Sequence, residues 1–291
     1  MLAGFLFGST FLVVKSSVER AAVLPFLSAR FLVGGLVLLP VALRRPPSRH
    51  ELRHGIAAGV CLLAGFVLQT AGLQSTRSST SAFITYLLIV FVPLLTALGS
   101  RTLPDRGVLV TLALAVPGLL LLAGGVSGLG RGELLTLLGA LAFALHIVVL
   151  GRTAAHHDAI RLTCWQVLTV GVCCLGPGAV HGGFGFDARV WFAVGFLGLG
   201  ATAVAFLCMV WGQRSVGESR AAVILLIEPL SAAVLGYAAG ERLGWRGAAG
   251  AVLILGAVVR AELGSERPVA VGAELVAPPQ AGEEGSPAPG P

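Results

Sequence analysis

Charged residues are scarce in this sequence, and their scarcity argues against an ordinary soluble fold. Only 12% of the 291 residues are Asp, Glu, Lys or Arg, whereas 56% are hydrophobic. Soluble domains carry about 25% charged residues, because their surfaces face water. A lipid bilayer is the simpler environment for such a chain.

Signatures of several other protein classes are also missing. The sequence has no Gly-x-x-x-x-Gly-Lys-[Ser/Thr] phosphate loop, so we expect no ATP hydrolysis. Its five cysteines lie inside apolar segments, with spacing that suits neither zinc nor a disulfide framework. The cluster His156, His157 and Asp158 is more typical of a solvated loop than of a metal site. We therefore expect neither an enzyme nor a bound cofactor or metal.

Basic residues do not mark a nucleic-acid interface. The net charge is +6, but the arginines punctuate apolar runs and do not gather on one basic face with interleaved aromatic residues. Such spacing is typical of the loops of a membrane protein. We expect a lipid bilayer and a small-molecule substrate as partners, and no nucleic acid.

Ten apolar segments predict ten transmembrane helices. Most reach the roughly 18–20 residues that cross about 30 Å of hydrocarbon, and a helix satisfies its own backbone groups there. The first segment has only about 13 apolar residues, or about 20 Å of helix, so we expect translation to begin upstream of Met1. The segments are 2–14, 25–43, 55–73, 79–99, 107–124, 133–151, 162–180, 190–212, 221–239 and 243–259.

The loop charges predict the orientation. With a cytoplasmic N-terminus, twelve Lys and Arg residues fall on the inside and seven on the outside, as the positive-inside rule favours. Both termini are thus expected in the cytoplasm, with the chain in the cell (inner) membrane. Residues 264–291 are rich in Pro, Gly, Ala and Glu, which predicts a disordered cytoplasmic tail.

The second half of the sequence resembles the first. The segment "GALAFALHIVVLGR" aligns Phe143 with Phe7, an offset of 143 − 7 = 136 that places Gln166 opposite Arg30. The segments "STSAFITYLL" and "SRAAVILLIE" align with an offset of 219 − 79 = 140. Five spans per half is an odd number, so the second half must be inverted, as in many secondary transporters. We predict repeats at 1–128 and 129–263.

Several motifs carry a resemblance to a known family over about residues 1–262. They are "GSTFLVVK" (8–15), "ARF" (29–31), "GLQSTRSSTSAFIT" (72–85), "FVPLL" (91–95), "GALAFALHIVVLGR" (139–152) and "QRSVGESRAAVILLIEPLSAAVLGYAAGERL" (213–243). In this order and spacing the chain resembles the EamA family of the drug/metabolite transporter superfamily. The resemblance implies an all-α polytopic membrane protein, with ten transmembrane helices in two inverted five-helix repeats around a substrate cavity. It also implies transport of small metabolites, often outward.

Glu228 is the only charged residue between positions 221 and 239. A charge at the centre of a membrane helix costs about 2.5–3.5 kcal/mol. One interpretation is a carboxylate that binds a proton or a cationic group, which would permit proton coupling. The other is a structural role, in which the side chain bonds backbone groups freed by Pro229. Pro93 and Pro229 are the predicted helix breaks.

Arg30 lies about one turn into its predicted span. The more favoured interpretation is that its side chain snorkels to the outer interface. The alternative is that it faces the cavity and pairs with Glu228 or with an anionic substrate, because arginine does not lose its charge.

The remaining candidates are aromatic, amide and imidazole side chains within the spans. Tyr86 and Gln69 lie well inside their spans, whereas tryptophans near span ends more often lie at the membrane interface. His146 is more simply a packing histidine than a proton relay. The candidate cavity residues are Glu228, Arg30, Gln69, Tyr86, His146, Gln166, Trp165 and Trp211.

The repeat favours a transporter over the other membrane classes. A channel requires a continuous polar pore or a charged ring, and intramembrane polar residues are few here. We expect a secondary-active transporter, more simply an exporter, of small metabolites or drug-like solutes. A membrane channel or scaffold without coupled transport is the alternative.

Overall fold

In the computed structural model, helices are the only regular secondary structure over the residues that it describes, which are 2–99, 101, 103, 106–123, 129–215 and 227–264. The helices are α1 (Leu2–Val18), α2 (Val23–Ala42), α3 (Arg49–Leu73), α4 (Ser78–Tyr86), α5 (Leu88–Gly99), α6 (Arg106–Ala123), α7 (Arg131–Thr153), η2 (Ala154–His156), α8 (Ala159–Val180), α9 (Ala188–Phe196), η3 (Leu197–Val204), α10 (Ala205–Ser215), α12 (Ile227–Ala238) and α13 (Gly244–Gly264).

Six helical segments in the described ranges are long and apolar enough to cross a membrane. This confirms the predicted all-α, multi-pass membrane protein. The number of ten spans stays a prediction: α1 has 17 residues and α12 has 12. The predicted tail lies outside the described residues, apart from Gly264 at the end of α13. The six segments are Val23–Ala42, Arg49–Leu73, Ser78–Gly99, Arg131–His156, Ala159–Val180 and Ala188–Trp211.

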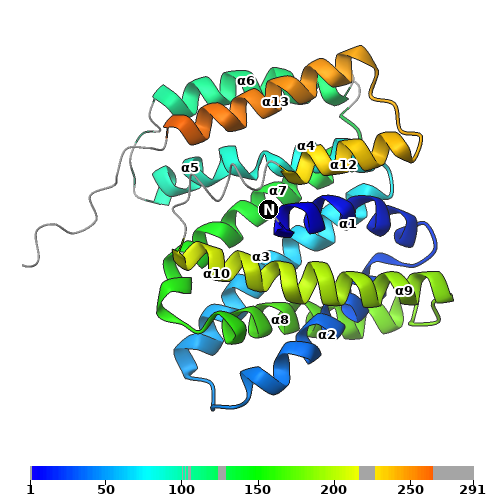
Figure 1. Ribbon diagram of the computed structural model, residues 1–291, viewed down its shortest axis with the longest axis vertical. Helices are drawn as coiled ribbons and strands as arrows, with labels where there is room; N and C mark the ends of the chain where they lie inside the picture. The colour runs from blue at the N-terminus through cyan, green and yellow to red at the C-terminus, as the bar shows by residue number, and fades with distance from the viewer. Residues whose placement is uncertain are drawn as a thin grey trace, which may run out of the picture.

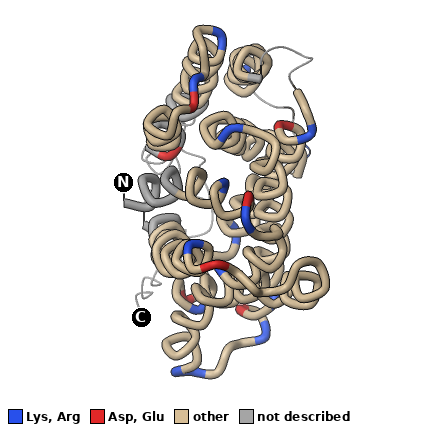
Figure 2. The backbone as a smooth tube through the Cα atoms, turned by 90° about the vertical axis from the view of Figure 1, so that its right-hand side faces the viewer, with Lys and Arg blue, Asp and Glu red and all other residues tan. Residues whose placement is uncertain are grey.

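The helices lie side by side in one bundle (Figure 1). Helix α2 packs along α8, α3 along α7 and α8, α6 along α13, and α1 against α12. Figure 2 shows long uncharged stretches of helix, with Lys, Arg, Asp and Glu few and scattered along the tube. The bundle therefore places elements from both ends of the sequence in direct contact.

Glycine allows several of these helices to approach closely. A Cβ atom on Gly65 would lie 2.5 Å from the Phe143 ring, and one on Gly59 would lie 2.8 Å from the carbonyl oxygen of Gln166. Lipid supplies little hydrophobic force between helices, so small residues at the contact provide close packing instead. The glycines of α3 thus set its distance from α7 and α8.

Two segments depart from regular α-helix. Helices α4 and α5 are separated at Leu87, whereas Pro93 lies inside α5. The break in this span therefore precedes the proline predicted to cause it by 93 − 87 = 6 residues. Between α9 and α10 the chain forms the eight-residue π-helix η3, a widened form that is frequent at functional sites.

We predict that Gly250→Ala destabilises the α6–α13 pair. The added Cβ would lie 2.5 Å from the Leu122 amide nitrogen and 2.6 Å from the Gly118 carbonyl oxygen. These are backbone atoms, so one helix must move, and overpacking of this kind costs about 1–3 kcal/mol. Denaturant unfolding in detergent micelles measures the loss.

Gly256→Ala in the same helix is the matched control, because a Cβ there meets no atom within 4 Å. The control should keep or slightly raise the free energy of unfolding, since alanine has the higher helix propensity. Equal stability of the two variants would contradict the close contact.

Candidate functional site

Arg30 is buried in the interior, where α2 meets η3. The residue is only 1% exposed, and its Nε donates a hydrogen bond to Thr202 Oγ1 at 3.0 Å. The guanidinium carbon lies 5.3 Å from the ring centroid of Phe31 and 5.0 Å from that of Phe66. Its Nη2 has no hydrogen-bond partner among the described residues.

The predicted snorkelling of Arg30 is therefore wrong. Helix α2 begins at Val23, which places Arg30 about two turns from the helix start. Its side chain turns into the protein because the Phe31 and Phe66 rings and the Thr202 hydroxyl offer it contacts there. No ion pair within the described part of the chain joins Arg30 to Glu228.

Aromatic rings connect Arg30 to the second half of the chain. The Phe66 ring lies 4.7 Å from Phe31, 5.1 Å from Phe143 and 6.0 Å from Phe206, centroid to centroid. The Phe206 ring is in turn 6.2 Å from the His146 imidazole. We call Arg30, Thr202, these four phenylalanines, His146 and Gln166 the central cluster.

His146 and Gln166 form a buried pair between α7 and α8. His146 Nε2 lies 2.7 Å from Gln166 Oε1, and the two residues are 2% and 0% exposed. An amide oxygen can only accept, so the hydrogen of this bond is carried by His146 Nε2. The second amide donor, Gln166 Nε2, has no partner among the described residues.

The other predicted cavity residues do not all lie together. Gln69 Nε2 donates to Thr85 Oγ1 at 2.8 Å, linking α3 to α4, and the nearby Tyr86 is buried. Trp165 is half-buried, and its Nε1 is buried without a partner among the described residues. Trp211 is 64% exposed, on the outside of the bundle.

Glu228 lies in the first turn of α12, which packs against α1 and α4. The residue is half-buried. Its carboxylate forms no hydrogen bond or ion pair with another residue that the structure describes. The structural interpretation stays a prediction, because the backbone carbonyl that Pro229 frees belongs to residue 225, which lies outside the described residues.

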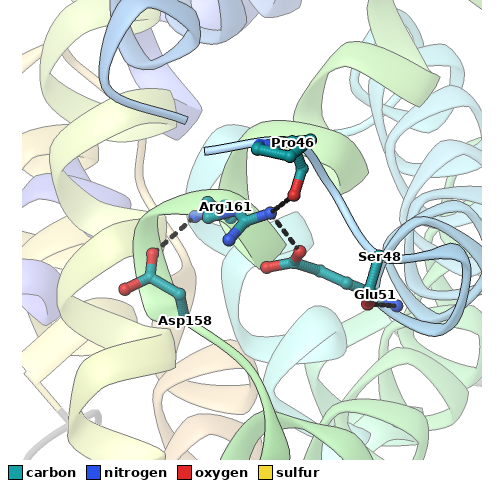
Figure 3. A network of polar contacts seen from close by, with 5 residues as sticks. All are labelled: Pro46, Ser48, Glu51, Asp158 and Arg161. Carbon is teal, nitrogen blue, oxygen red and sulfur yellow. Dashed lines mark hydrogen bonds and ion pairs between the residues drawn. The ribbon is translucent and has the colours of Figure 1, made fainter. Parts of the chain in front are cut away.

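A network of polar contacts joins the starts of α3 and α8 (Figure 3). Arg161 Nη2 lies 2.7 Å from Glu51 Oε2 and donates to the Pro46 carbonyl at 2.8 Å. Ser48 accepts from the Glu51 amide and Asp158 from the Arg161 amide, which caps both helices. The network therefore closes one end of the bundle between two helices and the 43–48 loop.

The sequence-based exclusion of an enzyme also rested on the absence of a His-Glu-x-x-His pair, and this is wrong, because Glu51 belongs to one. Residues 50–54 read His-Glu-Leu-Arg-His, a match to the His-Glu-x-x-His pattern of zinc proteases. Glu51 is engaged by Arg161, and His54 Nδ1 lies 2.7 Å from His157 Nε2. Burial and the neighbouring His54 lower the pKa of His157. Among the described residues, no group of three or more His, Cys, Asp or Glu side chains could hold a metal ion.

Glu241 closes the other end of the bundle, and sequence reasoning missed it. Its carboxylate accepts hydrogen bonds from the Ser78 amide and hydroxyl at 2.9 and 2.7 Å, and from those of Ser79 at 3.1 and 2.6 Å. Partial burial raises the pKa of Glu241, but the bonds from both serines outweigh it and lower the pKa overall. A charged carboxylate at the start of α4 is also favoured by the helix dipole.

A groove of about 350 Å³ opens beside Glu241. It lies between the end of α1, the start of α4 and the turn that follows α12. Its charged residues are of both signs, so it shows no preference for one charge. The lining residues are Leu12, Lys15, Ser16, Glu19, Arg77, Ala239, Gly240 and Glu241.

Comparison with known proteins gives consistent matches. The model of the EamA-like transporter family matches residues 1–124 and 130–261. An uncharacterized transporter of Archaeoglobus fulgidus is 29% identical over 229 residues, which are 78% of this chain and 72% of that protein. A second uncharacterized transporter from that organism is 30% identical over 210 residues, which are 72% of this chain and 74% of that protein.

Two further comparisons extend the match. The uncharacterized inner membrane transporter YedA of Escherichia coli K12 is 26% identical over 255 residues, covering 81% of this chain and 79% of its own. A solved crystal structure superposes with a TM-score of 0.66 at 21% identity, over 91% of this chain and 96% of that one. This last likeness supports the fold alone.

We predict that Arg161→Gln destabilises the protein far more than Arg20→Gln. Arg161 and Glu51 side chains are 17% and 5% exposed, whereas those of Arg20 and Asp187, 3.5 Å apart, are 49% and 47% exposed. Removing one partner of a buried pair leaves the other charge unpaired and costs about 3 kcal/mol. An exposed pair is worth about 1 kcal/mol or less.

Thermal and denaturant unfolding of both purified variants in detergent measures the difference. The glutamine substitution is the same in each, so side-chain chemistry is matched and only the burial differs. Equal losses would show that the Arg161–Glu51 network does not hold the helices together.

Proposed function

The chain belongs to the EamA-like transporter family, and from this membership of a family of multi-pass membrane transporters we propose a specific mode of action. The protein is a secondary-active transporter that exports small metabolites or drug-like solutes by alternating access. The observation that carries the proposal is the central cluster, which is built from both halves of the chain. Family and relatives also point to a transporter and not to an enzyme.

The helix positions support two inverted repeats, at 1–128 and 129–263. Helices α2 and α8 begin at Val23 and Ala159, a separation of 159 − 23 = 136 that equals the offset found in the sequence. Helices α5 and α12 begin 227 − 88 = 139 residues apart, and α6 and α13 begin 244 − 106 = 138 apart. In addition, α2 packs on α8 and α6 on α13. Contact between equivalent helices is what a pseudo-two-fold axis produces.

Transporters with inverted repeats bind their substrates between the repeats, and the contact of residues from both halves supports the central cluster as the substrate site. Arg30, Phe31 and Phe66 come from the first half, whereas His146 and Gln166 come from the second. Because these polar groups are buried, a substrate reaches them only if one end of the bundle opens.

The two polar networks at the ends are the proposed gates. One consists of Arg161, Glu51 and the Pro46 carbonyl, and the other of Glu241 with Ser78 and Ser79. Opening either end would break one network while the other stays closed. That alternation distinguishes a carrier from a channel, whose pore is continuous.

Orientation is part of the proposal, with both termini in the cytoplasm and the chain in the inner membrane. The name of the YedA relative places that protein in the inner membrane. We predict that a reporter active only in the cytoplasm gives signal when fused after Gly264, and also when fused before Met1. A periplasm-specific reporter at either position should be silent. Signal from opposite sides would refute an even number of spans and with it the two five-helix repeats.

We further predict that transport depends on pH through Glu228. Its carboxylate is half-buried within a predicted span, and ionisable groups in such positions often belong to proton relays. Screening solute tolerance in cells with and without the chain identifies a transported solute. Its flux in proteoliposomes should then vary between about pH 5 and pH 8 in the wild type and lose that variation in Glu228→Gln.

Glu19→Gln provides the control, because Glu19 is an exposed glutamate at the end of α1. This variant should keep the wild-type pH profile. A pH-independent wild-type flux would remove proton coupling from the proposal, and an absence of any flux would remove the transport function itself.

A further inference from the structure

We propose that Arg30 is the anion-binding group of the central cluster and that the substrate is a small organic anion, a carboxylate on an apolar, ring-bearing body. This inference rests on the proposed function, because it assigns the substrate class of the same site. Three observations support it. The charge of Arg30 has no counter-ion among the described residues, buried N–H donors in the cluster have no partner there, and the neighbouring side chains are aromatic rings.

The charge of Arg30 is buried without a counter-ion among the described residues. The two ion pairs in the described part of the chain are Arg20–Asp187 and Arg161–Glu51, both away from Arg30. Arginine does not deprotonate in proteins, and a buried charge without a partner is strongly unfavourable. The Thr202 hydroxyl and the two phenylalanine rings compensate it only in part, so an anion bound here would complete the site.

The unpartnered polar atoms of the central cluster are donors. Arg30 Nη2 and Gln166 Nε2 are buried N–H groups without a partner in the described residues. A ligand that satisfies them must bring acceptors. A carboxylate brings two oxygens with about four lone-pair sites, and the guanidinium is the group that binds it most specifically. An ammonium or other cationic head would be repelled by the like charge of Arg30.

Four further side chains of the central cluster are aromatic rings of phenylalanine. Phe66 packs edge-to-face on Phe31 and on Phe143, with interplanar angles of 68° and 81°. Such rings favour a flat or ring-bearing apolar group by edge and face contacts. The described side chains between Arg30 and His146 therefore suit a hydrophobic body behind the anionic group, and not a strongly polar one such as a sugar.

The repeat makes this preference directional. With the offset of 136, Arg30 corresponds to Gln166, because 30 + 136 = 166. One half therefore presents a fixed positive charge where the other presents a neutral amide. The anionic end of the ligand is expected on the α2 side, and a neutral acceptor group on the α8 side.

Ligand-induced thermal stabilisation of the purified protein in detergent tests the inference. The probes are 3-phenylpropanoate, its amide 3-phenylpropanamide and the amine 3-phenylpropylamine, which share one body and differ in charge. The carboxylate should stabilise the wild type, whereas the amide and the amine at the same concentration should not. Arg30→Gln should weaken carboxylate binding about 10- to 100-fold, Arg30→Lys should weaken it less, and Arg20→Gln should leave it unchanged.

Three results of this experiment would contradict an anion site at Arg30. Equal stabilisation by the amide or the amine, stabilisation by none of the probes, or an unchanged carboxylate preference in Arg30→Gln would overturn the inference. If Arg30→Gln does not fold, the comparison of the three probes on the wild type still decides. A purely structural Arg30 would lower the melting temperature on substitution without any difference among the probes.

Failure of this inference and failure of the proposed function give different results. Carboxylate binding without flux into proteoliposomes would refute transport and leave the anion site. Flux of a neutral or cationic solute, together with no carboxylate binding, would refute the anion site and leave the transporter.

Discussion

Hydrocarbon offers no hydrogen-bond partner, so a polar group that enters the bilayer must find its partner inside the protein. This constraint explains most polar contacts in the described bundle. Gln69 is bonded to Thr85, and His146 to Gln166. The exceptions are few, and two of them, Arg30 Nη2 and Gln166 Nε2, lie in the central cluster. Where most buried polar groups have a hydrogen-bond partner inside the protein, donors without one mark the place where a ligand can add hydrogen bonds.

The same constraint moves the strong charge interactions to the ends of the bundle. Arg161 and Glu51 join two helix starts and a loop at one end, and Glu241 caps α4 at the other. Each network holds together elements that would have to separate for that end to open. The described interior between them is joined by rings, glycine contacts and a few hydrogen bonds, so its helices can move without breaking an ion pair.

Much of the fold was predictable from hydropathy. The predicted segment 162–180 corresponds to α8 at Ala159–Val180, and 25–43 to α2 at Val23–Ala42, because span length and apolar composition are properties of the local sequence. Side-chain direction is not local. Arg30 was expected to snorkel because its distance from the span end was the only information available, whereas its true partners come from η3 and α3. The Glu241 cap was missed for the same reason, since Ser78 is more than 160 residues away.

Several residues of the candidate site were named from the sequence, but the contacts between them were not. Arg30, His146 and Gln166 were all named from the sequence, and the repeat aligned Arg30 with Gln166, but nothing in the sequence indicated the bond between His146 and Gln166. Thr202 and the phenylalanines were not foreseen, because threonine and phenylalanine in apolar spans are too common to stand out. The His-Glu-x-x-His match at residues 50–54 shows the opposite problem, a motif whose glutamate is already engaged elsewhere.

The bond between His146 and Gln166 has a consequence for the amide itself. By holding the oxygen of Gln166, the imidazole fixes which side of that amide remains available, and the available side is the NH₂ group. The imidazole thus orients the amide. If the hydrogen moved from Nε2 to Nδ1 of His146, Nε2 would become an acceptor, and the amide would have to rotate so that its NH₂ group faces the imidazole and its oxygen becomes the available side. The polarity of the α8 wall is in this sense decided one helix away, on α7.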